Sequence, residues 1–579
     1  MNMTKSYHKG HPNPAFYRKQ YTNLNGAWKF VFDMDEKGEQ EKYQEKFPEN
    51  HLMINVPYAY QSELSGINRP EILSDTIWYE REIVIDNIDK TYLLHFLAVD
   101  FETTVYINGK QALIHRGGYD AFTVKLDDYI KKGSNKITLK VVDKLYPDQI
   151  RGKQAWRKDN FTCFYQRISG IHESVYLEEV NKAYIEYFYL FGDYNKKELT
   201  FHVEVEDFQN KNVCLKFADK EYQFSLNKKV EDFIISIENP LMWSNDNPYL
   251  YDAVIYLKEN EQIIDEIETY FGFKSIRCEN KHIYINNQDI YLKLVLNQGY
   301  YQKGLTTSSE EEIIQDLQLI KECGFNGFRM HQHNPEPLLF YYADVLGLLV
   351  WQEIPSAAYY SYNTYRDSFY EIPRQIKFHF NHPCIMAYTL FNESWGVNEI
   401  RESEEIQKYT ADMVDYIRPL AKDRLIISND GWEHTKSDLL TIHHYGRTKK
   451  DLEADLDNNF FERLYNKENP DTIKNFKKAY AGDYRYHNEP ILLDEFFGVA
   501  LLKSKEGTNW GYGDFATDEK MYLNILKDQL DYLKAHSVYR GFCITQLTDV
   551  QQEVNGIFTY DRKAKCDINK IKEMLEEFE

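Results

Sequence analysis

Between residues 275 and 579 the sequence alternates apolar runs with helix-like segments, and this rhythm constrains the fold more than any other feature. Eight apolar runs end in polar residues, at 291–297, 325–331, 348–353, 385–390, 425–430, 440–445, 491–496 and 541–546. Strands that alternate with helices form parallel sheets or barrels. A typical helix follows the first run, where Ser309 and Glu312 make a capping box and Gly324 ends the helix. The pattern therefore predicts a (β/α)8 TIM barrel.

The first 270 residues have a different rhythm, with short alternating strands separated by turn signals. The Asn108-Gly109 pair is a strong signal for a tight hairpin turn. Residues 21–180 have the size of a jelly-roll β-sandwich, and the strands of the next segment fit an immunoglobulin-like β-sandwich. We predict a multidomain β and α/β fold with domains at 1–182 (jelly roll), 183–274 (immunoglobulin-like) and 275–579 (barrel).

Charge and cysteine pattern limit the classes of partner and compartment. Acidic residues outnumber basic ones, 91 to 69, and no long Lys/Arg run is present, which argues against nucleic acid or an anionic membrane as partner. No stretch is apolar enough to span a bilayer, and the first twenty residues lack a secretory signal. The seven cysteines are dispersed and form no CxxC motif, so we predict reduced thiols in a cytoplasmic protein.

Two glutamates at strand ends carry the functional prediction. The stretch HPCIMAYTLFNESWG (382–396) places Asn392 and Glu393 after the fourth strand, and EPILLDEFFG (489–498) places Glu495 at the seventh. These two strands face one another across a barrel mouth. Cleavage of a glycosidic bond needs one carboxyl as proton donor and one as nucleophile, about 5–5.5 Å apart in a retaining enzyme. A single glutamate here would equally suit a salt-bridged rim residue, but two favour a retaining glycosidase in which Asn392 holds the sugar's 2-hydroxyl.

Several motifs resemble glycoside hydrolase family two, the β-galactosidase and β-glucuronidase family. They are NGAWKF, VYINGK, SGIHESVYLEE, FGFKS, ADVLGLLVWQEIPS, FNESWG and the later DEF, in the family's order. The resemblance covers nearly the whole chain and implies a sugar-binding jelly roll, an immunoglobulin-like sandwich and a catalytic barrel. It also implies double displacement with Glu393 as acid/base and Glu495 as nucleophile, a glycoside or oligosaccharide substrate, and neither a cofactor nor a metal.

Other strand ends supply further candidates for substrate binding. Arg329 resembles the family's arginine that hydrogen-bonds the nucleophile, with an interior ion pair as the alternative. Tyr445 resembles the tyrosine that approaches the nucleophile, and Trp432 suits a stacking wall, although both residues also suit core packing. The remaining candidates are His331 and His444, which are as readily structural histidines, and Asn297, Gln298, Gln546 and Asp549, which are candidates by position.

Some positions depart from the better-known members of the family. The segment RMHQHNP (329–335) replaces R-x-S-H-Y-P, and Phe164 replaces an aspartate near the SGI motif. Glu553 and Asn555 stand where glucuronidases have an Asn-x-Lys pair that grips the uronic carboxylate. Because two carboxylates repel, we predict a neutral β-hexopyranoside, galactoside first, rather than a glucuronide. An exo-acting pocket, a cleft framed by residues 446–489, and a homo-oligomer all stay open.

Two alternatives belong to other classes of protein. A metal-dependent barrel hydrolase would use the His331-Gln332-His333 motif with His443, His444 and Asp549. Against it, the His-x-His falls on the second barrel strand rather than the first, and FNESWG would have no role. A catalytically weak or inactive carbohydrate-binding homologue is the other alternative, and retention of both glutamates argues against it.

Overall fold

The computed structural model describes residues 3–578 and begins with a two-layer sandwich. One sheet has the order β1 (Tyr21–Asn23), β12 (Val175–Val180), β5 (Thr91–Phe96) and β9 (Phe122–Lys125). The other has the order β3 (Leu52–Val56), β2 (Gly26–Phe32), β4 (Thr76–Ile85), β10 (Gly133–Val142), β7 (Glu102–Ile107) and β8 (Lys110–Arg116). The predicted Asn108-Gly109 turn joins β7 to β8, and both residues have the positive φ, 51° and 81°, that a tight hairpin turn requires.

A second sandwich follows and has its own apolar core. One sheet has the order β17 (Val230–Ser236), β14 (Glu198–Glu206), β13 (Tyr184–Asp193) and β20 (Phe273–Lys274). The other has the order β16 (Lys220–Ser225), β15 (Lys211–Phe217), β18 (Tyr251–Glu259) and β19 (Gln262–Phe271). Side chains of β14 are buried at every second residue, which is the period of a half-covered strand. The predicted boundaries at 182 and 274 fall between β12 and β13 and directly after β20.

A small sheet of β21 (Ile276–Glu279), β22 (His282–Ile285) and β23 (Gln288–Asp289) leads into an eight-stranded parallel sheet. Its strands are β24 (Leu292–Asn297), β25 (Gly327–Met330), β26 (Leu349–Glu353), β27 (Ile385–Thr389), β28 (Leu425–Ile427), β29 (Leu440–His443), β32 (Ile491–Phe497) and β33 (Tyr539–Thr545). Their order, β28-β27-β26-β25-β24-β33-β32-β29, is that of a barrel, and the predicted fold class is confirmed. Between its two end strands, the backbone N–H of Asp438, just before β29, donates to Ile426 O of β28 at 2.9 Å.

Helices cover the outside of the parallel sheet. They are α1 (Glu310–Glu322), α2 (Pro337–Leu346), α3 (Tyr362–Phe378), α4 (Glu404–Ala421), α7 (Glu519–Ala535) and α8 (Ile568–Glu576). The capping box predicted at Ser309 and Glu312 starts α1. None of the helices among residues 3–578 is long and apolar enough to cross a membrane.

Residues 446–489 form an excursion between β29 and β32. It contains α5 (Lys449–Asp455), α6 (Asn458–Tyr465) and the hairpin of β30 (Asp471–Ile473) and β31 (Lys477–Lys478). The hairpin returns to the barrel, because Lys477 Nζ lies 3.4 Å from Glu433 Oε2 and 4.8 Å from the ring centroid of Trp432.

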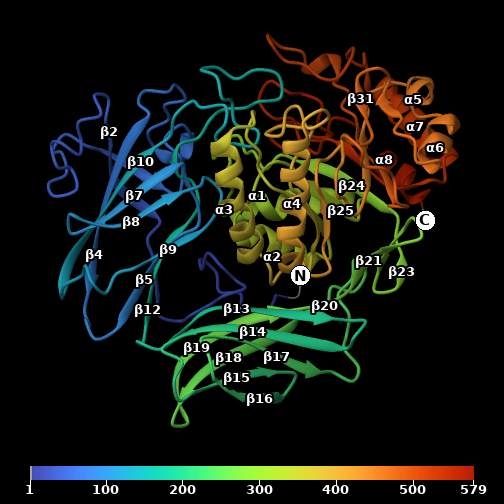
Figure 1. Cartoon of the computed structure of the whole chain (residues 1–579). Helices are drawn as coiled ribbons and strands as arrows, with labels where there is room; N and C mark the ends of the chain where they lie inside the picture. The colour runs from blue at the N-terminus through green and yellow to red at the C-terminus, as the bar shows by residue number, and fades with distance from the viewer. Residues whose placement is uncertain (1–2, 579) are drawn as a thin grey trace.

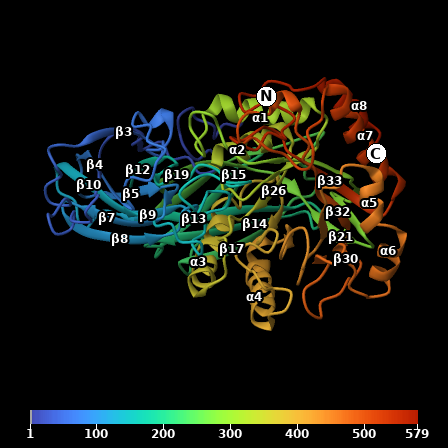
Figure 2. The same ribbon diagram turned by 90° about the horizontal axis from the view of Figure 1, so that it is seen from above.

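The three units lie against one another rather than in a row. In Figure 1 the jelly roll (blue) lies beside the barrel, and the second sandwich (green) lies below both. Figure 2 shows the same arrangement from above, with the jelly roll at one end and the barrel at the other. The jelly roll also reaches the barrel through its segment 153–166, where Trp510 Nε1 donates to Thr162 O at 2.7 Å.

Candidate active site

The barrel brings Glu393 and Glu495 together. One carboxylate oxygen of each, with a ring nitrogen of His443, lies within 4.8 Å of the other two. The Glu393 side chain is 24% exposed, whereas that of Glu495 is 5% exposed, so the first faces solvent and the second lies deeper. This separation suits attack by one carboxylate on a sugar carbon while the other donates a proton, and it is shorter than the ~6.5–9.5 Å of inverting enzymes.

The turn after β27 aims the Glu393 side chain. Glu393 and Ser394 both have positive φ, 52° and 63°, which non-glycine residues adopt uncommonly. The turn is held by the neighbouring strand: Glu393 N donates to Asp430 O at 3.0 Å, and Ser394 N donates to Asn429 Oδ1 at 2.9 Å. Because the loop after β28 fixes these amides, the carboxylate of Glu393 is held in a defined direction.

The carboxylate of Glu495 is surrounded by donors. Tyr445 Oη donates to its Oε2 at 2.6 Å, and an Arg329 guanidinium nitrogen lies 3.3 Å from its Oε1. The Tyr445 ring stacks on Tyr512, with centroids 3.5 Å apart and planes 2° from parallel. The stack orients the phenol, so Glu495 has its open face toward Glu393 and the sugar position.

Arg329 contacts both Glu495 and buried carboxylates in the barrel interior. It is fully buried, and besides Glu495 it contacts Glu353 at 2.7 Å, Asp430 at 2.8 Å and Asp494 at 3.3 Å. Burial raises the pKa of Asp494 well above its ordinary value, and the charge of Asp430 adds to this. For Asp430, burial also acts to raise the pKa, but Arg329, His443 and hydrogen bonds with Asp494 and Thr441 together lower it. The two interpretations of Arg329, nucleophile contact and interior ion pair, therefore describe one cluster.

Replacing Arg329 with methionine is expected to lower the free energy of unfolding by about 3–5 kcal/mol, because the buried carboxylates lose their cation. Urea unfolding of the purified variant measures this. The control is Arg277→Met, whose ion pair with Glu279 is exposed and is worth about 1 kcal/mol or less. Equal losses in the two variants would contradict the role of Arg329 in the buried cluster.

His443 lies between the two glutamates. Its Nδ1 is 2.9 Å from Glu393 Oε1 and 3.5 Å from Glu495 Oε2, and its Nε2 is 3.6 Å from Asp494 Oδ1. Burial would lower the pKa of His443, but the charges of Glu495 and Asp494 raise it well above the ordinary value. Burial likewise would raise the pKa of Glu393, but its hydrogen bond with His443 lowers it. The 2.9 Å contact therefore raises the pKa of His443 and lowers that of Glu393.

The side chain of His444, a predicted substrate ligand, lies outside this cluster. Its Nε2 is 2.9 Å from Asp455 Oδ2, and its Nδ1 accepts from Gly446 N at 3.1 Å. Successive side chains of a strand point to opposite faces. His443 and Tyr445 therefore share the face that carries the glutamates, and His444 points away from it.

The residues predicted as ligands in the metal-dependent alternative do not lie together in one cluster. Within residues 3–578, two groups of three potential ligands come within 4.8 Å: Glu393, His443 and Glu495, and Asp430, His443 and Asp494. His331 contacts Glu353 at 2.9 Å and lies 3.8 Å from Glu495 Oε1. The Asp549 carboxylate contacts Lys565 at 2.8 Å. Of the histidines and the aspartate in the predicted metal set, His443 alone belongs to either group.

The other predicted residues divide between the site and its support. Asn392 is buried, and its Oδ1 has no hydrogen-bond partner within the described chain, so it is free for a ligand. Trp432 packs edge-on against His443 with centroids 5.7 Å apart. Asn297 accepts from Gly299 N, but its Nδ2 and Gln298 Oε1 also have no partner within the described chain. Gln546 bonds Gln298 and Asn555, and Asp549 accepts from Gly556 N.

The jelly roll supplies Lys153, which sequence reasoning missed, next to Phe164, which the sequence marked as a departure from the family. Lys153 Nζ lies 5.4 Å from the Phe164 ring, and Phe164 packs edge-on against Trp395. Burial would lower the pKa of Lys153, but Cys163, Glu553 and the glutamate pair raise it. The contacts join distant segments, so no local pattern signals them.

A hollow of 340 Å³ opens beside Glu393. It is lined by Trp395 and Glu402 from the loop after β27 and by Phe476 and Lys477 from the excursion. The excursion therefore lies beside Glu393 at the mouth of the site.

Family models match along the whole described barrel and both sandwiches. "Glycosyl hydrolases family 2, sugar binding domain" matches residues 21–180, "Glycosyl hydrolases family 2" matches 175–274, and "Glycosyl hydrolases family 2, TIM barrel domain" matches 276–579.

Relatives with two different names are similar to this chain. A putative β-glucuronidase of Formosa agariphila is 25% identical over 69% of this chain and 49% of its own length, and a β-galactosidase of Thermoanaerobacter pseudethanolicus is 24% identical over 81% and 60%. The chain thus spans about half to three fifths of the length of these relatives. A β-glucuronidase of Paenibacillus borealis is 21% identical and matches over 95% of both chains.

Among solved structures, a β-glucuronidase from Ruminococcus gnavus in complex with D-glucuronic acid superposes with a TM-score of 0.78. It is 18% identical, and the match covers 96% of this chain and 98% of that one. At this identity the likeness concerns the fold.

Proposed function

The chain belongs to glycosyl hydrolase family 2, and from this premise we propose that it is a retaining exo-β-glycosidase that releases terminal non-reducing sugars. The observation that carries the proposal is the convergence of Glu393 and Glu495 to within 4.8 Å at the ends of the fourth and seventh barrel strands. That arrangement supports double displacement, because one oxygen can attack the anomeric carbon while the other faces the leaving oxygen.

In the first step Glu495 attacks the anomeric carbon, and the bond to the leaving oxygen breaks as Glu393 protonates that oxygen. Tyr445 and Arg329 hold the attacking carboxylate, and Asn392 is placed to bind the 2-hydroxyl. In the second step Glu393 takes a proton from water, and the water oxygen displaces Glu495 from the sugar. The configuration at the carbon inverts twice and is retained.

The proton for the first step comes from His443. Its Nδ1 lies 2.9 Å from Glu393 Oε1, so one short transfer turns Glu393 into the acid. The pair holds this proton until the pH rises past the raised pKa of His443. The basic limb of kcat/KM is therefore set by the pair rather than by Glu393 alone.

Replacing His443 with glutamine is expected to move this basic limb to lower pH. Without the imidazolium, the proton is held by Glu393 itself and leaves at a lower pH. Profiles of kcat/KM against pH measure the shift. Partial unfolding of the variant would lower the whole profile, but it would not change the pH at which the basic limb falls. His444→Gln, the same change one residue along, is the control and should leave the limb in place. An unmoved limb in the His443 variant would contradict the shared proton.

We propose a neutral β-hexopyranoside, galactoside first, as the sugar. Glu553 lies beside the jelly-roll segment 153–166, where its carboxylate accepts from Tyr165 Oη at 2.6 Å and from Asn555 Nδ2 at 3.0 Å. Lys153 is already compensated by Glu553 and the glutamate pair, so a uronic carboxylate would add uncompensated negative charge. Relatives named β-galactosidase support the choice, and those named β-glucuronidase make a glucuronide its direct competitor.

Nitrophenyl β-galactoside, β-glucoside and β-glucuronide, assayed side by side with proton NMR of the first-formed sugar, test the proposal. We expect the galactoside to be fastest and the β-anomer to appear first. A glucuronide turned over about tenfold faster would reject the neutral sugar, and an α-anomer formed first would reject retention. Binding without turnover of any glycoside would favour the inactive carbohydrate-binding homologue.

A cytoplasmic location and a possible homo-oligomer complete the proposal. The location is supported by seven cysteines that are all free thiols, of which five are buried. Gel filtration with light scattering measures the oligomeric state.

A further inference from the structure

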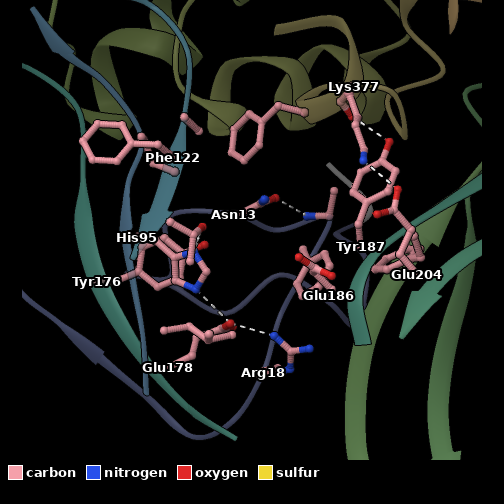
Figure 3. A pocket seen from close by; sticks show the side chains of 18 of the residues that line it. Asn13, Arg18, His95, Phe122, Tyr176, Glu178, Glu186, Tyr187, Glu204 and Lys377 are labelled. Atoms are coloured by element: carbon pink, nitrogen blue, oxygen red, sulfur yellow. Dashed lines mark hydrogen bonds and ion pairs between the residues drawn. The ribbon is translucent and has the colours of Figure 1, made fainter. Parts of the chain in front are cut away.

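A second cavity, of 560 Å³, lies where the three units meet (Figure 3). Its walls come from β5, β9 and β12 of the jelly roll, from β13 and β14 of the second sandwich, and from α3 of the barrel. Ligand sites of about 300–1,000 Å³ occur preferentially at such junctions between domains. The size and the place of this cavity are therefore those of a binding site.

The cavity is separate from the glutamate pair. Helix α3 starts just after Tyr359, whose ring is 5.8 Å from that of Trp156 in the jelly-roll segment at the barrel mouth. The helix ends at Phe378, which lines the cavity together with Arg374 and Lys377. A helix of 17 residues is about 25 Å long, so the cavity lies at the far end of α3 from the active site.

The charged groups of the cavity wall balance one another. Four basic residues, Arg18, Lys125, Arg374 and Lys377, line it with four acidic ones, Glu178, Glu186, Glu204 and Glu206. Arg18 contacts Glu178 at 2.7 Å, and Lys377 contacts Glu204 at 2.6 Å, as the dashed lines in Figure 3 mark. A charged ligand would disturb these pairs, whereas a neutral ligand with hydroxyl groups can donate to the carboxylates and accept from the cations.

One acceptor in the wall lacks a partner. Glu178 is 1% exposed, and its Oε2 contacts both Arg18 and His95. Its Oε1 has no hydrogen bond within the described residues. Since buried polar atoms are nearly always hydrogen-bonded, this oxygen calls for a donor such as a ligand hydroxyl.

Aromatic side chains form the rest of the wall. Tyr176 stacks on His95 with centroids 4.5 Å apart, and Phe122 and Tyr187 lie on opposite sides of the space in Figure 3. Flat apolar faces next to paired charges match a pyranose, which has an apolar C–H face and a rim of hydroxyls.

We propose that this cavity is a second saccharide-binding site, which takes a neutral mono- or disaccharide and lies at the end of α3 away from the catalytic pair. The site takes its aromatic walls from all three units and its hydroxyl partners from the Glu178 and Glu204 ion pairs. Binding there does not require turnover, so the inference is independent of the proposed reaction.

Two variants that fill the cavity test the inference. Thr123 and Lys125 are exposed residues of β9 that line it, and Thr123→Trp and Lys125→Trp add bulk there without removing core contacts. Val84→Trp is the control, because Val84 is 70% exposed on β4, in the opposite sheet. Thermal melting of each variant verifies the fold.

Calorimetric titration with thiocellobiose and methyl β-thiogalactoside, which resist hydrolysis, measures binding at concentrations up to about 20 mM. We expect one class of site to weaken about tenfold or more in both filled variants and to persist in the control, with turnover of nitrophenyl glycosides unchanged in all three. Methyl β-thioglucuronide should bind this class about tenfold more weakly than the neutral probes.

The inference is overturned if the filled variants bind the neutral probes as the control does, or if no probe binds the control. It is also overturned if turnover falls together with binding, since the probes would then report the active site.

Discussion

Replacing Glu495 with alanine is expected to lower kcat by a factor on the order of 10⁴ or more, and added azide is expected to restore turnover with an inverted product. The carboxylate is the group that would attack the sugar, and Tyr445 and Arg329 cannot replace it. Azide in the vacated space attacks from the same face, and no second displacement follows. The α-glycosyl azide is therefore the product.

Nitrophenyl glycoside assays with and without azide, followed by NMR of the azide product, measure this. The control is Glu402→Ala, which removes an exposed carboxylate from the hollow beside Glu393 and should keep most of the activity. A Glu495 variant that kept more than roughly a few per cent of the rate without azide would remove the nucleophile assignment.

Replacing Glu393 with alanine is expected to have effects that depend on the leaving group. Substrates with poor leaving groups should lose about 10²–10⁴ in rate, because they require the proton that Glu393 delivers. Activated aryl glycosides, whose leaving oxygen departs without a proton, should lose much less in the first step. The size of the loss should thus rise with the pKa of the leaving alcohol.

A series of aryl glycosides whose phenols differ in pKa measures this dependence. Glu399→Ala, on the same loop and lining the same hollow, is the matched control and should show equal, small effects across the series. The same loss on every substrate in the Glu393 variant would argue against the acid role.

The barrel could be predicted because its signals are local. Each apolar strand carries its own hydrophobic run, and α1 carries its own capping box at Ser309 and Glu312. The strand ends also placed Glu393 and Glu495 on facing strands, since the barrel order follows from the chain order. The small sheet β21–β23 was missed because its short strands resemble turns.

The two histidines at the end of β29, His443 and His444, show what the period of a strand can add to the choice of site residues. Tyr445 and His444 were both predicted to face the substrate, although neighbours on a strand point to opposite faces. Tyr445 and His443 are two residues apart and share a face, and His443 is the residue that contacts Glu393. The period of the strand was sufficient to choose His443.

The residues from other units could not be predicted in this way. The segment that carries Lys153 is held against the barrel by contacts between distant residues, such as Gly152 N to Ser356 O and Trp510 Nε1 to Thr162 O. Tyr512 meets Tyr445 through a loop that has no regular period. Such contacts depend on how the domains dock, and no window of sequence contains both partners.

The jelly-roll segment at the barrel mouth is synthesised long before the barrel residues that it contacts. During synthesis Lys153 and Phe164 leave the ribosome hundreds of residues before Glu495. Because domains generally fold as units in chain order, the jelly roll can form before Trp395, the barrel residue that Phe164 contacts, has been synthesised. A nascent chain stalled before β32 would thus lack Glu495, and the glutamate pair would be complete only after residue 495 of 579 has been added.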